Sequence, residues 1–167
     1  MKNYILSALS ASAIVVSCST VSSVLQNTLP FNSSFVINEG TPSNSKHSVV
    51  GAGTGINQIF GVSQNVQDIR ANNATLTVSS GAQGMGVFRS VEVYLTYGNK
   101  EVLVASRDQI SDNIGNSLSL DLTNRNLDDI MKSGNSIQQK IVYTLKSSPT
   151  QNMQLKSSLT FSSVPVK

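Results

Sequence analysis

Apolar and polar residues alternate in several short stretches of this chain, most regularly in residues 87–97. From Val91 to Leu95 every second residue is valine or leucine, which places these side chains on one face of an extended strand. Gly98-Asn99 follows and is typical of a tight hairpin, because glycine readily adopts a positive φ. The pattern therefore predicts a β-hairpin in which residues 101–106 form the returning strand.

The faces of this hairpin can be assigned from the same alternation. In the returning strand, Leu103 and Ala105 are expected on one face. Arg89 interrupts the apolar face of the first strand, which suggests a sheet edge or a β-bulge at that point. The opposite face of the first strand carries Glu92 together with an aromatic and hydroxyl set: Phe88, Tyr94 and Thr96.

Similar alternation predicts further strands at residues 34–39, within 69–79, and at 117–122, 136–146 and 151–164. Turn-forming residues separate them, in a polar loop at 43–48, a glycine loop at 81–86 and a turn at 147–150. The glycine-rich residues 49–61 match no single element. About seven strands, with at most one short helix, predict an all-β fold, an antiparallel β-sandwich.

The expected helix covers residues 127–132. Asn126 is a suitable N-cap, Asp128 and Asp129 fall in the first turn, where acidic groups are favourable, and Gly134 can end the helix.

The charge composition limits the classes of partner that we expect for this protein. Only 13% of the residues are charged, and the net charge is +3. The basic residues are scattered along the chain and form no cluster of the kind that binds nucleic acid, so we expect no nucleic-acid partner.

The N-terminal segment has the layout of an export signal. Lys2 precedes the uncharged, mostly apolar stretch Tyr4–Val16, which is shorter than the ~20 residues that a transmembrane helix needs. The stretch ends in Val15-Val16-Ser17-Cys18, which resembles the lipobox of bacterial lipoproteins, and Cys18 is the only cysteine of the chain. This resemblance implies cleavage before Cys18, a diacylglyceryl group on its thiol through a thioether bond and usually an amide-linked acyl chain on its amino group, with fatty acids such as palmitate.

The lipobox resemblance implies a domain organisation and an address. Residues 1–17 would be the signal peptide, 18–33 a lipidated tether and 34–167 the β-sandwich domain. The membrane would be a partner through the lipid anchor. Ser19 follows the cysteine where an aspartate would be expected for inner-membrane retention, so we expect a cell-envelope protein on the outer membrane that faces the periplasm.

The strand segments also resemble small β-sandwich lipoproteins of unassigned role in Bacteroidota. The segments that carry this resemblance are Arg89-Ser-Val-Glu-Val-Tyr-Leu, Glu101-Val-Leu-Val-Ala-Ser, Leu118-Ser-Leu-Asp-Leu and Leu127-Asp-Asp-Ile. Lipid-anchored β-sandwiches of type VI secretion systems are similar in layout. Neither resemblance implies a catalytic residue, a metal or a cofactor.

Candidate catalytic groups are few. His47 is the only histidine, and Ser45 and Ser48 are beside it, but a catalytic Ser–His pair is built by fold geometry and not by adjacency in the chain. We therefore expect a solvated surface histidine. Gly51-Ala-Gly-Thr-Gly55 lacks the Lys-Ser/Thr of a phosphate loop and is expected to be a loop that approaches other backbone closely.

Calcium ligands have two candidate positions. Carboxylates occur at Asp108 and Asp112 and at the Asp128-Asp129 pair, but neither group has the spacing of an EF-hand loop. Turn and helix-start chemistry accounts for both.

The expected function is thus a membrane-anchored, non-catalytic binding or structural module with no cofactor, whose further partner is another envelope protein or a glycan. Phe88, Tyr94 and Thr96 are the candidate partner-binding residues if they are half-exposed, although in a sandwich they could pack in the core instead. The alternative is a small hydrolase or calcium-dependent binding domain on the same anchor, which would depend on His47, Asp108 or Asp128.

Overall fold

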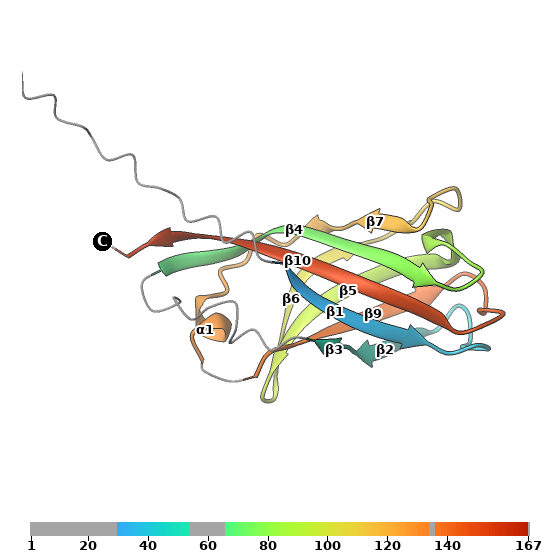
Figure 1. Cartoon of the computed structure of the whole chain (residues 1–167), viewed down its shortest axis with the longest axis horizontal. Helices are drawn as coiled ribbons and strands as arrows, with labels where there is room; N and C mark the ends of the chain where they lie inside the picture. The colour runs from blue at the N-terminus through green and yellow to red at the C-terminus, as the bar shows by residue number, and fades with distance from the viewer. Residues whose placement is uncertain (1–29, 54–65, 134–135, 167) are drawn as a thin grey trace, which may run out of the picture.

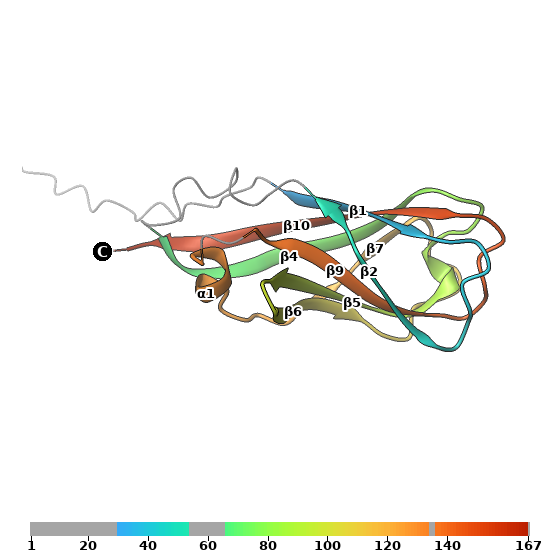
Figure 2. The ribbon, with the colours of Figure 1, turned by 90° about the horizontal axis from the view of Figure 1, so that it is seen from below.

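Two antiparallel sheets, each of five strands, account for most of the protein in the computed structural model, which describes residues 30–53, 66–133 and 136–166. The sheets face each other and enclose one core (Figure 2). The predicted all-β sandwich is therefore confirmed, with ten strands where about seven were expected. The predicted signal peptide and Cys18 lie outside the described residues.

The first sheet, called sheet A here, has the order β3-β1-β10-β4-β7 (Figure 1). Its strands are β3 (Ala52–Gly53), β1 (Phe31–Ile37), β10 (Met153–Pro165), β4 (Val66–Ser80) and β7 (Ser117–Ser119). The second, sheet B, has the order β2-β9-β5-β6-β8. Its strands are β2 (Lys46–Val50), β9 (Gln138–Leu145), β5 (Phe88–Tyr97), β6 (Lys100–Arg107) and β8 (Asp121–Leu122).

The core forms because alternate side chains of both sheets point into the space between them. In β10, for example, Met153, Leu155, Ser157 and Leu159 are fully buried while the residues between them are exposed or partly exposed. The largest core side chains are four phenylalanines that compensate for the absence of tryptophan: Phe31, Phe35, Phe88 and Phe161. Because Phe31 is buried in β1, this strand begins at Phe31 and not at the expected residue 34.

The predicted β5–β6 hairpin is present. Tyr97 pairs with Lys100, and Gly98 has a φ of 54°, a value that glycine adopts without strain. An irregularity in β6, opposite the step from Val93 to Tyr94, shifts the register between the two strands. As a result Val104 and Ala105 are both buried, while Leu103 moves to the outer face, so the expectation that Leu103 and Ala105 share a face was wrong.

The segment that was predicted as one strand, residues 117–122, belongs to both sheets. β7 pairs with β4 in sheet A, and β8 pairs with β6 in sheet B. At the crossing point Leu120 is buried and its N–H donates to the carbonyl of Ala74 at 3.0 Å, while Thr123 N–H donates to the carbonyl of Val104 at 3.0 Å. The chain thus crosses from one sheet to the other along one side of the sandwich.

A second crossing occurs on the other side, at Gly51. There the chain passes from β2 in sheet B to β3 in sheet A, and Gly51 N–H donates to the carbonyl of Gln139 at 2.9 Å. A Cβ atom at Gly51 would lie 2.1 Å from Ser33 Oγ and 2.6 Å from the ring of Phe35. Only glycine fits this corner, and the closely packed segment predicted around it is confirmed at this position.

β2 itself was not foreseen. Residues 43–48 were expected to be a polar loop, but Lys46 to Ser48 pair with β9 as the first residues of β2. The reason is that β2 lies at the edge of sheet B, where polar residues that face solvent do not prevent strand pairing.

Helical structure is limited to single turns in the described residues. α1 (Asp128–Met131) is shorter than the predicted 127–132, and the 3₁₀ turn η3 (Met85–Val87) includes the end of the predicted glycine loop and Val87, which was predicted to begin the strand. Leu127 occupies the N-cap position, but the side chain of Asn126 does accept the N–H of Asp128 at 2.8 Å. Gly134, the predicted end of the helix, lies outside the described residues.

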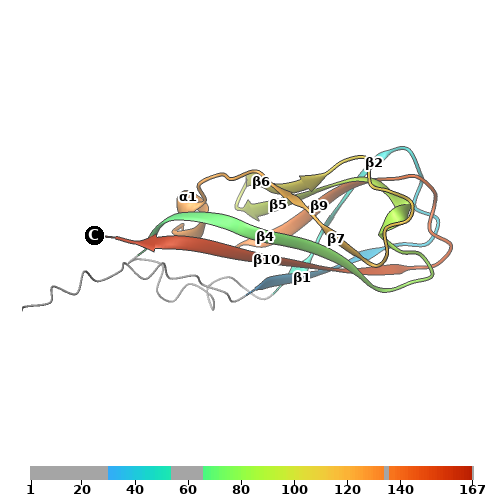
Figure 3. The same cartoon turned by 90° about the horizontal axis from the view of Figure 1, so that it is seen from above.

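The connections gather at two opposite ends of the sandwich (Figures 1 and 3). One end, the loop end, carries the four connections 38–45, 81–87, 108–116 and 146–152. The other, the entry end, contains α1, the β5–β6 turn and the ends of β4 and β10 near the C-terminus. β1 runs toward the loop end, so the described chain begins at Pro30 on the side of the entry end.

Candidate functional site

The outer face of sheet B contains the predicted Tyr94 and Thr96. Tyr94 is half-buried there, and its hydroxyl donates to Glu92 Oε2 at 2.9 Å. Burial raises the pKa of Tyr94, and the hydrogen bond to the Glu92 carboxylate and the negative charges of Glu92 and Glu101 raise it further. Thr96 is also half-buried, and its hydroxyl approaches the carbonyl of Gln138 at 3.4 Å.

Ion pairs flank Tyr94 on this face. Lys46 on β2 pairs with Glu92 on β5 at 3.2 Å, and Lys140 on β9 pairs with Glu101 on β6 at 2.7 Å. Lys140 Nζ also lies 6.0 Å from the centre of the Tyr94 ring, within range of a cation–π interaction. Tyr94 therefore belongs to a chain of charged and polar contacts that crosses four strands.

Aliphatic side chains share the same face. Val50 and Lys140 are cross-strand partners, as are Lys140 and Tyr94, and Tyr94 and Leu103, which puts these four side chains in one row. Val50 is 50% exposed, and Leu103 is partly exposed. We define the Tyr94 face by this row and its charged and polar neighbours: Lys46, Val50, Glu92, Tyr94, Thr96, Glu101, Leu103 and Lys140.

Phe88, the third predicted partner-binding residue, does not belong to the Tyr94 face. The register of β5 against β9 shifts between Phe88 and Ser90, which is the irregularity expected at Arg89. The shift turns Phe88 inward, where it is 0% exposed and meets the Tyr143 ring edge-on at 5.9 Å between centroids. The core position is thus the correct one of the two alternatives for this residue.

His47 has a defined environment on β2. Its Nε2 lies 2.9 Å from Ser45 Oγ and 2.8 Å from the carbonyl oxygen of Pro42, and its ring lies 5.6 Å from that of Tyr143. A carbonyl oxygen can only accept a hydrogen bond, so Nε2 must carry a proton. A protonated Nε2 cannot remove the proton of Ser45, and this geometry does not suit a nucleophilic serine.

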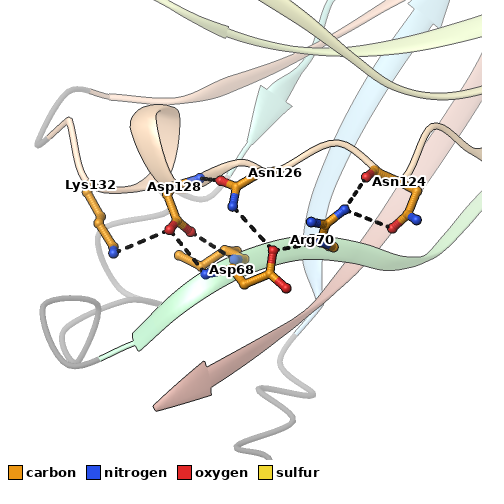
Figure 4. Close-up of polar contacts among 7 residues, drawn as sticks. Asp68, Arg70, Asn124, Asn126, Asp128 and Lys132 are labelled. Atoms are coloured by element: carbon orange, nitrogen blue, oxygen red, sulfur yellow. Dashed lines mark hydrogen bonds and ion pairs between the residues drawn. The ribbon is translucent and has the colours of Figure 1, made fainter. Parts of the chain in front are cut away.

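The carboxylates considered for calcium are engaged elsewhere. Asp128 accepts hydrogen bonds from the backbone N–H groups of Ile69 at 2.8 Å and Asp68 at 3.1 Å, and its carboxylate lies 3.6 Å from Lys132 Nζ (Figure 4). Burial by itself raises the pKa of Asp128, but these hydrogen bonds and Lys132 lower the pKa below its ordinary value of 3.8. Asp128 therefore closes the outer edge of β4, where no strand pairs with Ile69.

The network around Asp128 extends along the same edge. Asp68 has a positive φ of 54° and accepts hydrogen bonds from Arg70 Nε at 2.7 Å and Asn126 Nδ2 at 3.3 Å. Arg70 in turn donates to the carbonyl oxygen of Asn124 at 2.6 Å. These contacts attach the segment before α1 to β4, which explains the network as part of the fold (Figure 4).

The other carboxylates considered for calcium, Asp108 and Asp112, do not form a shared site. Asp108 is exposed in the loop after β6, and Asp112 pairs with Lys146. No group of three or more histidine, cysteine, aspartate or glutamate side chains in the described residues is placed to hold a metal ion.

A second candidate site is a pocket of about 340 Å³ at the loop end. Three connections contribute its walls, and the residues that line it are Gln83, Gly84, Gly86, Val87, Asp112, Ile114, Lys146 and Ser147. Lys146 Nζ donates to the carbonyl of Ile110 and to Asp112 Oδ1, so the ammonium group is held at the wall of the pocket.

Close backbone packing fixes the shape of this pocket. A Cβ atom at Gly86 would lie 2.3 Å from the carbonyl oxygen of Asp112, and one at Gly84 would lie 3.0 Å from that of Gly115. Met85 N–H donates to the carbonyl of Gly115 at 2.9 Å, which joins the two connections directly. The pocket is thus formed by segments held against each other.

The sequence predicted loops at 81–86 and 147–150, which include Gln83, Gly84, Gly86 and Ser147, but it predicted strands at Val87 and Lys146, and it singled out only Asp112, as a candidate calcium ligand. The run Gly-Ala-Gln-Gly-Met-Gly at 81–86 was a visible signal for a tightly packed loop. Its meeting with Asp112 and Lys146 depends on tertiary structure, since Lys146 and Asp112 are 34 positions apart.

Comparisons with known proteins add no assignment, because no protein-family model matches the chain and no curated protein matches it. Neither helical turn within the described residues could cross a membrane.

Proposed function

We propose that this protein is a lipid-anchored, non-catalytic binding module of a bacterial cell envelope, which recognises another envelope protein through the Tyr94 face. The anchor is supported by the segment that ends in Val15-Val16-Ser17-Cys18 and by the absence of a second cysteine from the sequence. A diacylglyceryl thioether, with or without an amide-linked third chain, holds a protein on a bilayer far longer than one myristoyl chain.

The observation that carries the binding role is the difference between the outer faces of the two sheets. The row across sheet B contains Val50, Lys140, Tyr94 and Leu103. The comparable row across sheet A consists of Ser34, Lys156, Thr77 and Ser117. Tyrosine is enriched at protein interfaces and serine is depleted there, so the presence of Tyr94 in the row on sheet B distinguishes the two rows.

Such a face suits recognition by side chains. Tyr94 presents a large ring at little entropic cost, because the Glu92 hydrogen bond and the neighbouring Lys140 already restrict it. The flanking ion pairs provide a charged rim that selects the orientation of the partner.

The first experiment tests the anchor. Cells that express the full chain are given a labelled fatty acid, and the wild type is expected to incorporate it and to fractionate with membranes. Cys18→Ser should abolish the label, and a control with Ser17→Ala should retain it because a small residue is kept before the cysteine. Membrane retention of Cys18→Ser together with an unlabelled wild type would refute the anchor.

The second experiment tests the Tyr94 face. The full chain is crosslinked in intact cells and recovered from detergent-solubilised envelopes, and the partner is identified by mass spectrometry. Tyr94→Ser should reduce recovery of that partner at least tenfold, whereas Val36→Ser, at a 51% exposed position on sheet A, should not. Equal recovery with both variants, each folded by circular dichroism, would refute the assignment.

A further inference from the structure

We propose that the loop-end pocket binds a single saccharide unit, a neutral ligand that carries vicinal hydroxyl groups. This site is separate from the Tyr94 face, since its walls come from the connections 81–87 and 108–116 and from Lys146-Ser147. Its volume of about 340 Å³ is at the small end of the range for ligand pockets and suits one ring better than an extended chain.

The polar groups on the pocket wall include both donors and acceptors. Lys146 uses two of its three N–H donors, on the Ile110 carbonyl and on Asp112 Oδ1. Asp112 is 83% exposed on its side chain, which leaves acceptor capacity on its carboxylate, and the Ser147 hydroxyl is exposed. A hydroxyl group can accept from Lys146 and donate to Asp112 at the same time.

The side chain of Gln83 adds an amide oxygen to the pocket wall. Its Oε1 is buried without a hydrogen-bond partner in the described structure. A buried unsatisfied acceptor costs stability, so its retention requires a reason, and rotation of the amide toward the pocket would give Oε1 a hydroxyl group of the ligand as its partner.

The charge state of the pocket suits a neutral ligand. Asp112 and Lys146 neutralise each other. The pocket therefore carries no net charge that would favour an anion or a cation over a neutral polyol. The buried Val87 and the partly buried Ile114 provide an apolar wall for the C–H groups of a sugar ring.

The position of the pocket also fits an anchored protein. β1 begins at Phe31 on the side of the entry end, and the connections that line the pocket are at the opposite end (Figures 1 and 3). If Cys18 is held in a bilayer, as proposed above, the chain from the anchor enters the sandwich on the side away from the pocket, which leaves the pocket free to meet envelope glycans. This orientation rests on the proposed function, but binding of a saccharide does not.

The test is saturation-transfer NMR on the full chain in detergent micelles, with glucose, galactose, mannose and N-acetylglucosamine as separate probes and glycine as a zwitterionic control. At least one saccharide should receive saturation. Gln83→Leu and Ser147→Ala should each weaken its binding roughly tenfold, because each removes one hydrogen-bonding group. Gln154→Leu on the exposed outer face of β10 is the matched control and should bind as the wild type does.

Gln83→Leu removes a buried oxygen that has no partner, so this variant is expected to remain as stable as the wild type. Loss of binding at unchanged unfolding temperature therefore supports a ligand contact. No transfer to any saccharide, transfer to glycine alone, or equal transfer in Gln83→Leu and Gln154→Leu overturns the proposal. None of these results depends on fatty-acid labelling or on partner recovery through Tyr94, so failure here is distinguishable from failure of the anchor or of the Tyr94 face.

Discussion

The edge of β4 that Asp128 closes provides a quantitative test of the fold. Replacing Asp128 with alanine leaves the N–H groups of Asp68 and Ile69 without their carboxylate acceptor. A hydrogen bond to a charged group contributes about 1.5–3 kcal/mol when buried. Because 24% of the Asp128 side chain is exposed and water can replace part of each bond, we expect a total loss of about 2 kcal/mol, to which Lys132 adds little.

Urea unfolding of the full chain, followed by circular dichroism, measures this loss. The matched control is Asp129→Ala, since Asp129 is the exposed neighbour in the same first turn of α1. Asp129→Ala should change the free energy of unfolding by less than about 0.5 kcal/mol. If the two variants were equally stable, the hydrogen bonds of Asp128 would not hold the edge of β4.

The lowered pKa of Asp128 also gives a pH dependence with a defined sign. The folded-state pKa is below the ordinary value of 3.8, so the unfolded chain binds the proton more readily than the folded chain. The contribution of Asp128 is complete above that ordinary value and is lost as the pH falls through the folded-state pKa. The stability difference between wild type and Asp128→Asn should therefore be constant near neutral pH and shrink below about pH 4. A difference that grew on acidification would contradict the argument.

Three further predictions concern single positions. Gly51→Ala should cost about 1–3 kcal/mol, because its Cβ would overlap Ser33 and Phe35, whereas Gly115→Ala, with nothing within 4 Å of the added atom, should not; thermal unfolding compares the two. Neutral His47 should carry its proton on Nε2, and a nitrogen-15 spectrum that shows the Nδ1–H tautomer would contradict the hydrogen bond to Pro42. Glu92→Gln should lower the pKa of Tyr94 toward 10.0 without reaching it, since burial and Glu101 still raise it, and a carbon-13 titration of the tyrosine rings measures this.

Most strands could be predicted because their alternation is local. In β5, β9 and β10 every second residue points inward over most of the strand, and most of these residues are apolar. The Gly98-Asn99 turn is recognisable from its own residue types. The errors occur where the alternation changes phase. A bulge changes which face the side chains on one side of it point to. Phe88 lies beyond the irregularity at Arg89, which was foreseen, and Leu103 lies beyond the irregularity at Val104, so both residues were assigned to the wrong faces.

Crossings between sheets could not be predicted for a different reason. Residues 117–122 have the pattern of one alternating strand. Nothing in that pattern shows that the pairing partner changes at Leu120, from β4 to β6. The partners of a strand are a property of the whole fold, and an alternating pattern indicates only which side chains face inward.

The candidate sites were predictable to unequal degrees. Tyr94 and Thr96 lie together on an outer face because both belong to one strand, and period-two alternation was sufficient to group them. The loop-end pocket joins Gln83, Asp112 and Lys146 from three separate connections. No local pattern contains that information.

The short edge strands limit how this protein can recognise a partner. The outermost strands of the two sheets are β3 and β8, of two residues each, β7 of three and β2 of five. The chain continues from β2 to β3 and from β7 to β8, so each sheet edge leads into the other sheet. These short strands offer little backbone to an added strand, but β3 pairs only with Ser33 and Ser34 of β1, and β8 only with Ala105 and Ser106 of β6. Part of β1 and part of β6 therefore still lie at a sheet edge.

A partner that binds through side chains of the Tyr94 face and a partner that adds a strand to a sheet edge could both be recovered by crosslinking, but they respond differently to mutation. A partner that docks on the Tyr94 face should be lost with Tyr94→Ser and be insensitive to a proline in β2. A partner that adds a strand should show the reverse, because proline removes a backbone donor from the edge. Sensitivity to proline at Ser48 combined with indifference to Tyr94→Ser would show that backbone pairing, and not the Tyr94 face, holds the partner.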